Sequence, residues 1–518
     1  MSVKSKILWV DDEIEILKPH ILFLEQKGYE LSPVSNGNDA LDLIKTEDFD
    51  IIFLDENMPG LSGLETLTHI KNLKPNIPVV MITKSEEEAI MEEAIGSKIA
   101  DYLIKPVNPN QILLSLKKNL EDRRLRQEKT TGSYQREFTK LGMEISPNLT
   151  FDEWSALYRK LIYWELELQE SGDESMLQIL RTQKEEANKV FSKAFIRNYR
   201  DWLNDKNNPP LLSHNVMQKS VFPLLGKNEK VLVVVIDNLR FDQWKAIQPA
   251  IEEHFRVVSD KMYCSILPTA TQYARNSLFS GLMPTEIQKK FPKLWIEDDD
   301  DENSKNQYEP ELFAELLKRL GLNIKHNFTK ILNLRAGRKY VDTFSNIASN
   351  QLNVLIYNFV DMLSHSKTNM EIIKELANDE AAYRSITSSW FDHSPLAEVF
   401  DLAARNNFKI VLTTDHGSIR VKNPMKIFGD RETNANIRFK YGRNLNSDGK
   451  NVFEVKNPAD LFLPRPNVST SYMFCISADY FVYPNNYNYY VNFFADTFQH
   501  GGISLEENLI PLITLAPK

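Results

Sequence analysis

The chain has 518 residues, of which 42% are hydrophobic and 26% charged. This is the composition of an ordinary globular protein, and it excludes fibrous and largely disordered classes. The length predicts roughly two to four domains. The net charge of −9 leaves no basic footprint for duplex DNA.

Two further features bear on the compartment of the protein. The two cysteines, Cys264 and Cys475, lie in apolar stretches, and nothing at the N-terminus resembles a signal peptide. No window approaches the ~20 apolar residues that would span a bilayer. We therefore expect a cytoplasmic protein with no membrane insertion.

The first 120 residues alternate short apolar runs with helix-like segments. The segments at 13–27, 38–47 and 62–73 are typical of helices. This alternation predicts an α/β domain with a doubly wound, flavodoxin-like parallel sheet. Four runs are expected to form its strands: "KILWVD" (6–11), "DIIFLD" (50–55), "PVVMIT" (78–83) and "ADYLIK" (100–105).

These strands deliver polar groups at their carboxyl ends, where parallel sheets bind ligands. Asp11, Asp12 and Asp55 would gather three carboxylates, which a Mg²⁺ ion would neutralise. Thr83 and Lys105 add a hydroxyl and an ammonium suited to a phosphoryl group. The pattern indicates phosphorylation of Asp55. The alternative is a sheet whose strand-end acids are merely solvated.

Over residues 1–122 the motifs "VDD", "LDENMPGLSGLE" and "YLIKP" resemble the receiver domain of two-component response regulators. The resemblance implies that Asp55 is the phosphorylation site and that a sensor histidine kinase is the partner. It also implies that the carbonyl of Asn57 binds Mg²⁺ and that Tyr102 is an aromatic switch residue. The peptide bond between Lys105 and Pro106 is typically cis in that family.

Residues 123–225 are expected to form a helical-bundle spacer. The segment 121–128 continues a helix out of the first domain, and we expect "TTGSYQ" (130–135) to interrupt it. A helix-turn-helix that reads DNA is the alternative, which the long helices and interspersed acids disfavour. Apolar residues recur at helical spacing at Trp154, Leu157, Leu161 and Trp164, and again at Leu177, Leu180, Val190, Phe191, Ala194, Phe195 and Tyr199.

The last 290 residues repeat the pattern of buried strands that end in acids. "KVLVVVID" (230–237) is a continuous apolar run, as expected of a strand buried on both faces, and it ends in Asp237. Asp361 and Asp415 end two further runs. Thr271 follows a Pro-Thr turn just before a helical pattern, which places a hydroxyl near a helix N-terminus.

Three of only nine histidines stand near these acids: His365, His416 and His500. Mixed carboxylate and imidazole ligands in this number exceed the need of one metal ion and suit two. Zinc takes both ligand types readily. Paired ions recur in enzymes that displace groups at phosphorus. The acidic run "EDDDDE" (297–302) lacks a strand framework and is interpreted as a solvated loop.

Residues 226–518 resemble the alkaline phosphatase superfamily, which includes PglZ domains with a central sheet. The matching motifs are "VIDNLRFD", "PTATQYARNSLFSGLMP", "DMLSH", "TTDHGS" and "HGGISLEENLIPL". The resemblance implies that Thr271 is the catalytic nucleophile. It also implies two zinc sites, one formed by Asp237, Thr271, Asp415 and His416, and the other by Asp361, His365 and His500.

The substrate class is less strongly indicated. Cys264 is followed by "SILP", which departs from the sulfatase motif and disfavours sulfate esters. A phosphate monoester needs more cationic neutralisation than a diester. The predicted threonine nucleophile and its motif resemble those of nucleotide pyrophosphatases. This resemblance favours a phosphodiesterase that acts on nucleotide-type diesters, among them oligonucleotides. The arginines that could neutralise the phosphate at the site are Arg240, Arg275, Arg335 and Arg338.

The order of receiver, helical spacer and PglZ domain resembles PorX-like response regulators. That resemblance implies a PorY-like kinase, a phosphorylation-dependent homodimer and regulation of type IX secretion. The alternative is a regulatory interaction protein that binds a sigma factor or a secretion component and whose zinc is mainly structural.

Overall fold

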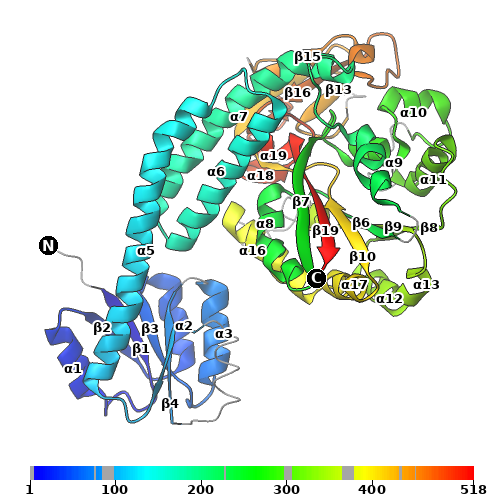
Figure 1. Cartoon of the computed structure of the whole chain (residues 1–518). Coiled ribbons are helices and arrows are strands. Elements are labelled where there is room, and N and C mark those ends of the chain that lie inside the picture. Colours follow the sequence, from blue (N-terminus) through cyan, green and yellow to red (C-terminus); the bar gives the residue numbers. More distant parts are fainter. Residues whose placement is uncertain are drawn as a thin grey trace. The chain divides into compact units, whose positions relative to one another are not determined.

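The computed structural model describes residues 5–74, 77–84, 99–226, 229–296, 306–363, 379–430, 434–449 and 451–518, except the side chains of 121–124 and 126 (Figure 1). His365 and the acidic run at 297–302 lie outside these residues. The chain forms two compact units. One comprises Met1–Thr139 and Trp164–Ile179, and the other Lys140–Tyr163 and Leu180–Lys518.

The first unit contains a five-stranded parallel sheet in the order β2-β1-β3-β4-β5. Successive strand residues face opposite sides, so Leu8 and Ile52 enter one apolar core and Trp9 and Phe53 the other. The predicted doubly wound fold is confirmed. Its elements are β1 (Lys6–Val10), α1 (Lys18–Gln26), β2 (Glu30–Val34), α2 (Gly37–Thr46), β3 (Ile51–Asp55), α3 (Gly63–Leu73), β4 (Val79–Thr83) and β5 (Asp101–Ile104).

Two helix predictions in this region need correction. α1 begins at Lys18 rather than at residue 13, and the proline near its start suits a first helical turn. The expected interruption at 130–135 is wrong, because α5 (Pro109–Glu144) runs through it. The buried ring of Tyr134 packs 5.5 Å from that of Trp164. Such packing outweighs the roughly 1 kcal/mol that a helical glycine such as Gly132 costs.

The predicted helical spacer is confirmed as helices α6 (Phe151–Ser171) and α7 (Glu174–Leu203) after α5. The predicted apolar stripes are buried at the expected spacing, except that Trp164 and Val190 are half-buried. In the second unit the rings of Trp154 and Phe191 lie 5.4 Å apart, and Phe195 stacks on Tyr199 at 4.6 Å. No helix among the described residues combines the length and apolar character that a membrane crossing requires.

The second unit is built on a six-stranded sheet in the order β7-β19-β10-β6-β9-β8. β6 lies between β10 and β9 and is parallel to both, whereas β19 is antiparallel to β10 and β7. Apart from its first residue, β6 is buried throughout, as predicted. The strands are β6 (Lys230–Ile236), β7 (Phe255–Cys264), β8 (His326–Ile331), β9 (Leu352–Tyr357), β10 (Phe408–Thr413) and β19 (Leu509–Pro517).

Helices surround this sheet, and short strands of separate sheets lie beyond one end of it (Figure 1). The longer helices are α8 (Phe241–Glu252), α9 (Thr271–Ser280), α11 (Glu309–Arg319), α12 (Leu334–Asp342), α16 (Glu380–His393), α17 (Pro395–Arg405) and α18 (Tyr487–Phe494). The shorter ones are α10 (Pro284–Lys290), α13 (Phe344–Ile347) and α19 (Leu505–Asn508), with single turns η1 (Ser213–Asn215), η2 (Met217–Val221), η3 (Phe222–Leu224) and η5 (Pro458–Leu461).

The remaining strands form three small sheets. β11 (Ile419–Arg420) pairs with β18 (Phe498–Gln499), and these two strands carry the segments next to His416 and His500. The other two sheets are β14 (Asn446–Ser447), β12 (Asn423–Phe428) and β17 (Asp479–Val482), and β13 (Phe439–Gly442), β16 (Ser471–Cys475) and β15 (Val452–Val455).

Candidate phosphorylation site and candidate metal centre

The carboxyl ends of β1 and β3 bring three acids together in the first unit. One ligand atom each from Asp11, Asp12 and Asp55 lies within 4.8 Å of the others. Asp11 and Asp55 are buried, whereas Asp12 is exposed. Three carboxylates at this spacing fit a hard divalent cation such as Mg²⁺, because oxygen ligands are what it prefers.

Lys105 completes this cluster from the end of β5. Its Nζ lies 2.9 Å from Asp11 Oδ2 and 3.1 Å from Asp55 Oδ1. Burial, and next the charge of Asp11, raises the pKa of Asp55 to about 6. The peptide bond between Lys105 and Pro106 is cis. The expected lysine is therefore in direct contact with the expected phosphorylation site.

The other expected receiver residues lie around the cluster. The buried Thr83 hydroxyl donates to the side chain of Glu56, a residue that the sequence analysis missed although it follows Asp55 directly. Tyr102 packs against the apolar core beside β4 and β5, and the Asn57 side chain is exposed. Thr83 thus reaches the surroundings of Asp55 through a carboxylate neighbour.

In the second unit, adjacent strands place a second acidic cluster. Asp237 follows β6, and Asp415 and His416 follow the neighbouring β10. One ligand atom from each of these three residues lies within 4.8 Å of the others, and all three side chains are buried. The strand end predicted at Asp361 is wrong, because β9, on the other side of β6, ends at Tyr357 and Asp361 lies in a short helical stretch after it. The sheet order still places all three acids after neighbouring strands.

Thr271 is the first residue of α9, at the helix N-terminus where backbone N–H groups favour an anion. Its Oγ1 lies 3.0 Å from His416 Nε2. The other ring nitrogen of His416, Nδ1, donates to the carbonyl of Gly417. His416 Nε2 consequently carries the lone pair and accepts the Thr271 hydroxyl hydrogen.

His500 joins the cluster from the residue after β18. Its ring stacks on that of His416 with centroids 4.3 Å apart, and its Nε2 lies 3.8 Å from Asp361 Oδ1. His500 Nδ1 donates to the carbonyl of Thr269. Both imidazoles therefore keep the Nε2 lone pair for the site, which is the arrangement that metal-bound histidines use.

The carboxylates of this cluster fit a cation. Asp237 Oδ1 and Asp415 Oδ2 are buried oxygens that accept no hydrogen bond from the described residues. Burial raises the pKa of Asp237 to about 7 against the opposing effect of Arg275, and burial also raises the pKa of Asp415. Buried carboxylates are stable only when paired or bound to metal, so these donors suit zinc.

Of the four arginines considered from the sequence, Arg275 contacts this cluster. Its Nη1 lies 2.5 Å from Asp237 Oδ2, and its Nε donates to Glu309 Oε1 at 2.5 Å. Arg240 instead pairs with Asp242 in the buried core. Arg338 pairs with Glu398 at the surface, and the side chain of Arg335 is exposed.

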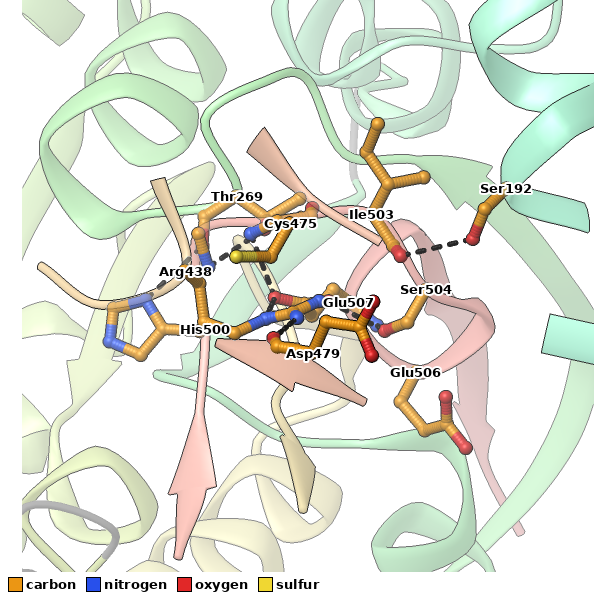
Figure 2. Close-up of polar contacts among 12 residues, drawn as sticks. Ser192, Thr269, Arg438, Cys475, Asp479, His500, Ile503, Ser504, Glu506 and Glu507 are labelled. Carbon is orange, nitrogen blue, oxygen red and sulfur yellow. Dashed lines mark hydrogen bonds and ion pairs between the residues drawn. The ribbon is translucent and has the colours of Figure 1, made fainter. Parts of the chain in front are cut away.

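A second buried network holds the segment that follows His500 (Figure 2). The Thr269 hydroxyl accepts from the Gly501 N–H at 3.0 Å and donates to the Gly502 carbonyl at 2.9 Å. The Gly502 N–H donates to Glu507, which is paired with the fully buried Arg438. Sequence reasoning missed Arg438 and Glu507, although "SLEEN" begins only four residues after His500.

Comparison with known proteins assigns each part of the chain. The model of the BREX system PglZ alkaline phosphatase-like domain matches residues 216–515, more than half of the chain. The chain belongs to the PglZ family. The PorX response regulator linker domain matches residues 124–203, and the response regulator receiver domain matches residues 7–117. This protein is thus a PorX-like fusion of a receiver, a linker and a PglZ domain, and the predicted boundaries at 122/123 and 225/226 remain predictions.

Two transcriptional regulators each match about a quarter of the chain. The transcriptional regulatory protein ResD of Bacillus subtilis is 33% identical over 114 residues, 22% of this chain and 47% of ResD. ZraR of Klebsiella oxytoca is 33% identical over 26% of this chain and 31% of its own. The chain therefore spans less than half the length of these regulators.

Solved receiver structures match the same region. A CheY-like receiver domain from Methanospirillum hungatei is 28% identical, covering 23% of this chain and 96% of its own, with a TM-score of 0.23. Chemotaxis protein CheY4 of Vibrio cholerae is 29% identical, covering 23% of this chain and all of its own, with a TM-score of 0.22. Receiver domains bind Mg²⁺, and alkaline phosphatase-like domains typically use metals.

Proposed function

We propose that this chain is a response regulator in which phosphorylation of Asp55 controls a two-zinc phosphodiesterase with Thr271 as nucleophile. The observation that carries the proposal is the 3.0 Å contact between Thr271 Oγ1 and His416 Nε2 beside the buried carboxylates of Asp237 and Asp415. A nucleophile, a helix N-terminus and unpartnered carboxylate oxygens converge there. This convergence supports displacement at phosphorus.

The residues present divide into two ligand groups around Thr271. Asp237, Thr271, Asp415 and His416 would hold one ion, and Asp361 and His500 would share the other with His365, which lies outside the described residues. When bound, such ions activate the hydroxyl and stabilise charge on the phosphate oxygens.

The chain's own groups then account for the steps at phosphorus. The Thr271 hydroxyl loses its proton to solvent, and its oxygen forms the new bond to phosphorus as the bond to the leaving alkoxide breaks. The alkoxide takes up a proton from water and leaves as an alcohol, which yields a phosphothreonine. Backbone N–H groups in the first turn of α9 face the added negative charge. Water then cleaves the phosphothreonine and restores the Thr271 hydroxyl.

The charge balance of the site supports a diester rather than a monoester. Arg275 is already neutralised by Asp237 and Glu309, so its guanidinium is not available to a dianionic phosphate. Arg240, Arg335 and Arg338 do not contact the cluster through any described interaction. A monoanionic diester needs less cationic compensation, and a nucleotide-type diester is the proposed substrate class.

The test is hydrolysis of bis(p-nitrophenyl) phosphate by the zinc-loaded full chain. We expect turnover that falls at least a thousandfold in Thr271→Ala and is partly retained in Thr271→Ser, which keeps a hydroxyl. Equal turnover in wild type and Thr271→Ala would refute the nucleophile. Absence of turnover in a zinc-loaded wild type would favour the interaction protein that binds a sigma factor or a secretion component.

The regulatory half of the proposal rests on the contact of Asp55 with Lys105 and the clustered acids. A small phosphodonor with Mg²⁺ should label the wild type but not Asp55→Ala. Labelling should also change sedimentation, through a phosphorylation-dependent homodimer, and diester turnover. Labelled protein with unchanged sedimentation and turnover would separate the receiver from the enzyme, and the proposed role in type IX secretion would lose its physical basis.

A further inference from the structure

The linker helix α7 contacts the catalytic part of the second unit through one buried polar face. Asn188, Ser192 and Tyr199 are spaced by four and seven residues, so they lie along the same side of the helix. All three are buried, and Ser192 and Tyr199 have no exposed surface. Each of them hydrogen-bonds a backbone group outside the linker.

Asn188 holds the start of α19 through both ends of its amide. Its Oδ1 accepts from the Leu505 N–H at 2.7 Å, and its Nδ2 donates to Glu506 Oε2 at 2.9 Å. Lys184, one turn earlier, lies 3.3 Å from Glu506 Oε1. The segment from His500 to α19 is thus fastened to the linker by its far end.

Ser192 fastens the middle of the same segment. Its hydroxyl has one proton, which the Asn188 carbonyl of its own helix at 2.8 Å shares with the Ile503 carbonyl at 3.2 Å, three residues after His500 (Figure 2). The carbonyl of Glu506 lies only 2.1 Å from where a Cβ on Gly417 would stand. The clamped segment therefore also packs directly against the turn that carries His416.

Tyr199 reaches the loop that carries the nucleophile. Its hydroxyl oxygen accepts from the Leu267 N–H at 2.7 Å, four residues before Thr271. Thr269, in the same loop, accepts from His500 Nδ1 through its carbonyl. One face of α7 consequently touches both the Thr271 loop and the His500 segment.

We propose that Asn188, Ser192 and Tyr199 are positioning residues that set the relative placement of Thr271 and His500. The linker thereby completes the metal centre of the PglZ domain. The metal and activity consequences rest on the proposed function, whereas the positioning of the two loops does not. Residues that orient a ligand from outside the coordination sphere typically change metal affinity about 10–100-fold when removed.

The experiment compares Asn188→Leu, Ser192→Ala and Tyr199→Phe in the full chain. Ser155→Ala is the matched control, because within the described part of the chain that buried hydroxyl on α6 bonds only the Phe151 carbonyl of its own helix. Hydrogen–deuterium exchange of the metal-free protein follows peptides over 499–508 and 264–271. Zinc affinity is measured by competition with a chromophoric chelator.

We expect faster exchange over 499–508 in Asn188→Leu and Ser192→Ala, and over 264–271 in Tyr199→Phe. Zinc affinity should fall about 10-fold or more in Asn188→Leu and less in the two single-bond variants. Ser155→Ala should match the wild type in both measurements. Asn188→Gln, which retains an amide, should recover part of the zinc affinity.

Two outcomes would overturn the proposal. One is unchanged exchange in both peptides for Ser192→Ala and Tyr199→Phe, which remove single hydroxyls and should leave the fold intact. The other is a zinc affinity in Asn188→Leu that equals the zinc affinity of Ser155→Ala. A wild type that binds no zinc would contradict the proposed function alone, because the exchange data on the metal-free protein would still test the positioning.

Discussion

In each of the two units, a cationic side chain neutralises a cluster of buried carboxylates, but the side chain differs. In the first, Lys105 contacts Asp11 and Asp55 and keeps 12% of its side-chain surface exposed. In the second, Arg275 contacts Asp237 and Glu309 and keeps 2% exposed. Both cations stand at the carboxyl ends of parallel strands, beside clustered carboxylates.

The difference lies in how firmly each cation is held. A lysine is a compact charge on a flexible stem, whereas an arginine presents a planar fork that binds two groups at fixed angles. Lys105 can therefore exchange partners under the proposed phosphorylation of Asp55. Arg275 is fixed between two buried acids and acts as part of the framework that orients Asp237.

Removal of the fixed cation should have the largest effect. Arg275→Met leaves Asp237 and Glu309 buried without compensation, and loss of one partner of a buried pair costs roughly 3–5 kcal/mol of unfolding free energy. Urea denaturation of the metal-free protein measures it. Arg338→Met, at an exposed pair with Glu398, is the control and should cost less than about 1 kcal/mol. Equal losses in both variants would contradict the framework role of Arg275.

The pH dependence of metal binding should distinguish the acidic clusters around Asp237 and Asp55. The expected effect is smaller than that of Arg275→Met. The pKa values of Asp237 and Asp55 are raised to about 7 and about 6. Protons should therefore compete with zinc below about pH 7 and with Mg²⁺ below about pH 6, by about tenfold per pH unit and carboxylate. Calorimetric titrations between pH 5.5 and 8 measure both affinities.

The same pKa values fix the sign for stability without metal. Both lie above the ordinary value of 3.8, so the folded protein binds these protons more tightly than the unfolded chain. Their contribution is complete below about pH 4 and is lost as the pH rises through 6 and 7. If the metal-free wild type and Asp237→Asn both became more stable as the pH rose through 6 and 7, the raised pKa of Asp237 would be contradicted.

The smallest effect is expected at Lys330, which contacts Glu309, a partner of Arg275. Lys330 Nζ lies 3.0 Å from Glu309 Oε2 and keeps 24% of its side-chain surface exposed. Lys330→Met should cost about 1 kcal/mol of unfolding free energy and change zinc affinity only slightly. Lys325→Met, whose exposed ammonium bonds Ser349, is the matched control. A zinc affinity reduced as strongly as in Arg275→Met would show that Lys330 acts directly on the cluster.

The strand-end residues were predictable because a parallel sheet gathers the carboxyl ends of its strands. Asp11, Asp55, Asp237 and Asp415 each follow a continuous apolar run, and the sequence shows such runs directly. The position of Arg275 had a signal as well, because it follows Thr271 by four residues and shares its helix face.

The partners of these residues were not predictable in the same way. Glu309 meets Arg275 from α11, and Asn188 meets Leu505 across 317 positions of the chain. No local period marks such pairs, because only the tertiary fold brings them together. The misplaced helix break at 130–135 has a related cause, since the packing of Tyr134 decides the conformation around Gly132.

The antiparallel strand β19 has a consequence for the order of events during synthesis. β19 (Leu509–Pro517) lies between β7 and β10, so the sheet of the second unit is closed by residues that follow all its other strands in the chain. The receiver sheet, by contrast, is complete by Ile104. Because domains generally fold in the order of their emergence, a nascent chain can hold a folded receiver domain well before the sheet that places Asp237 and Asp415 is complete.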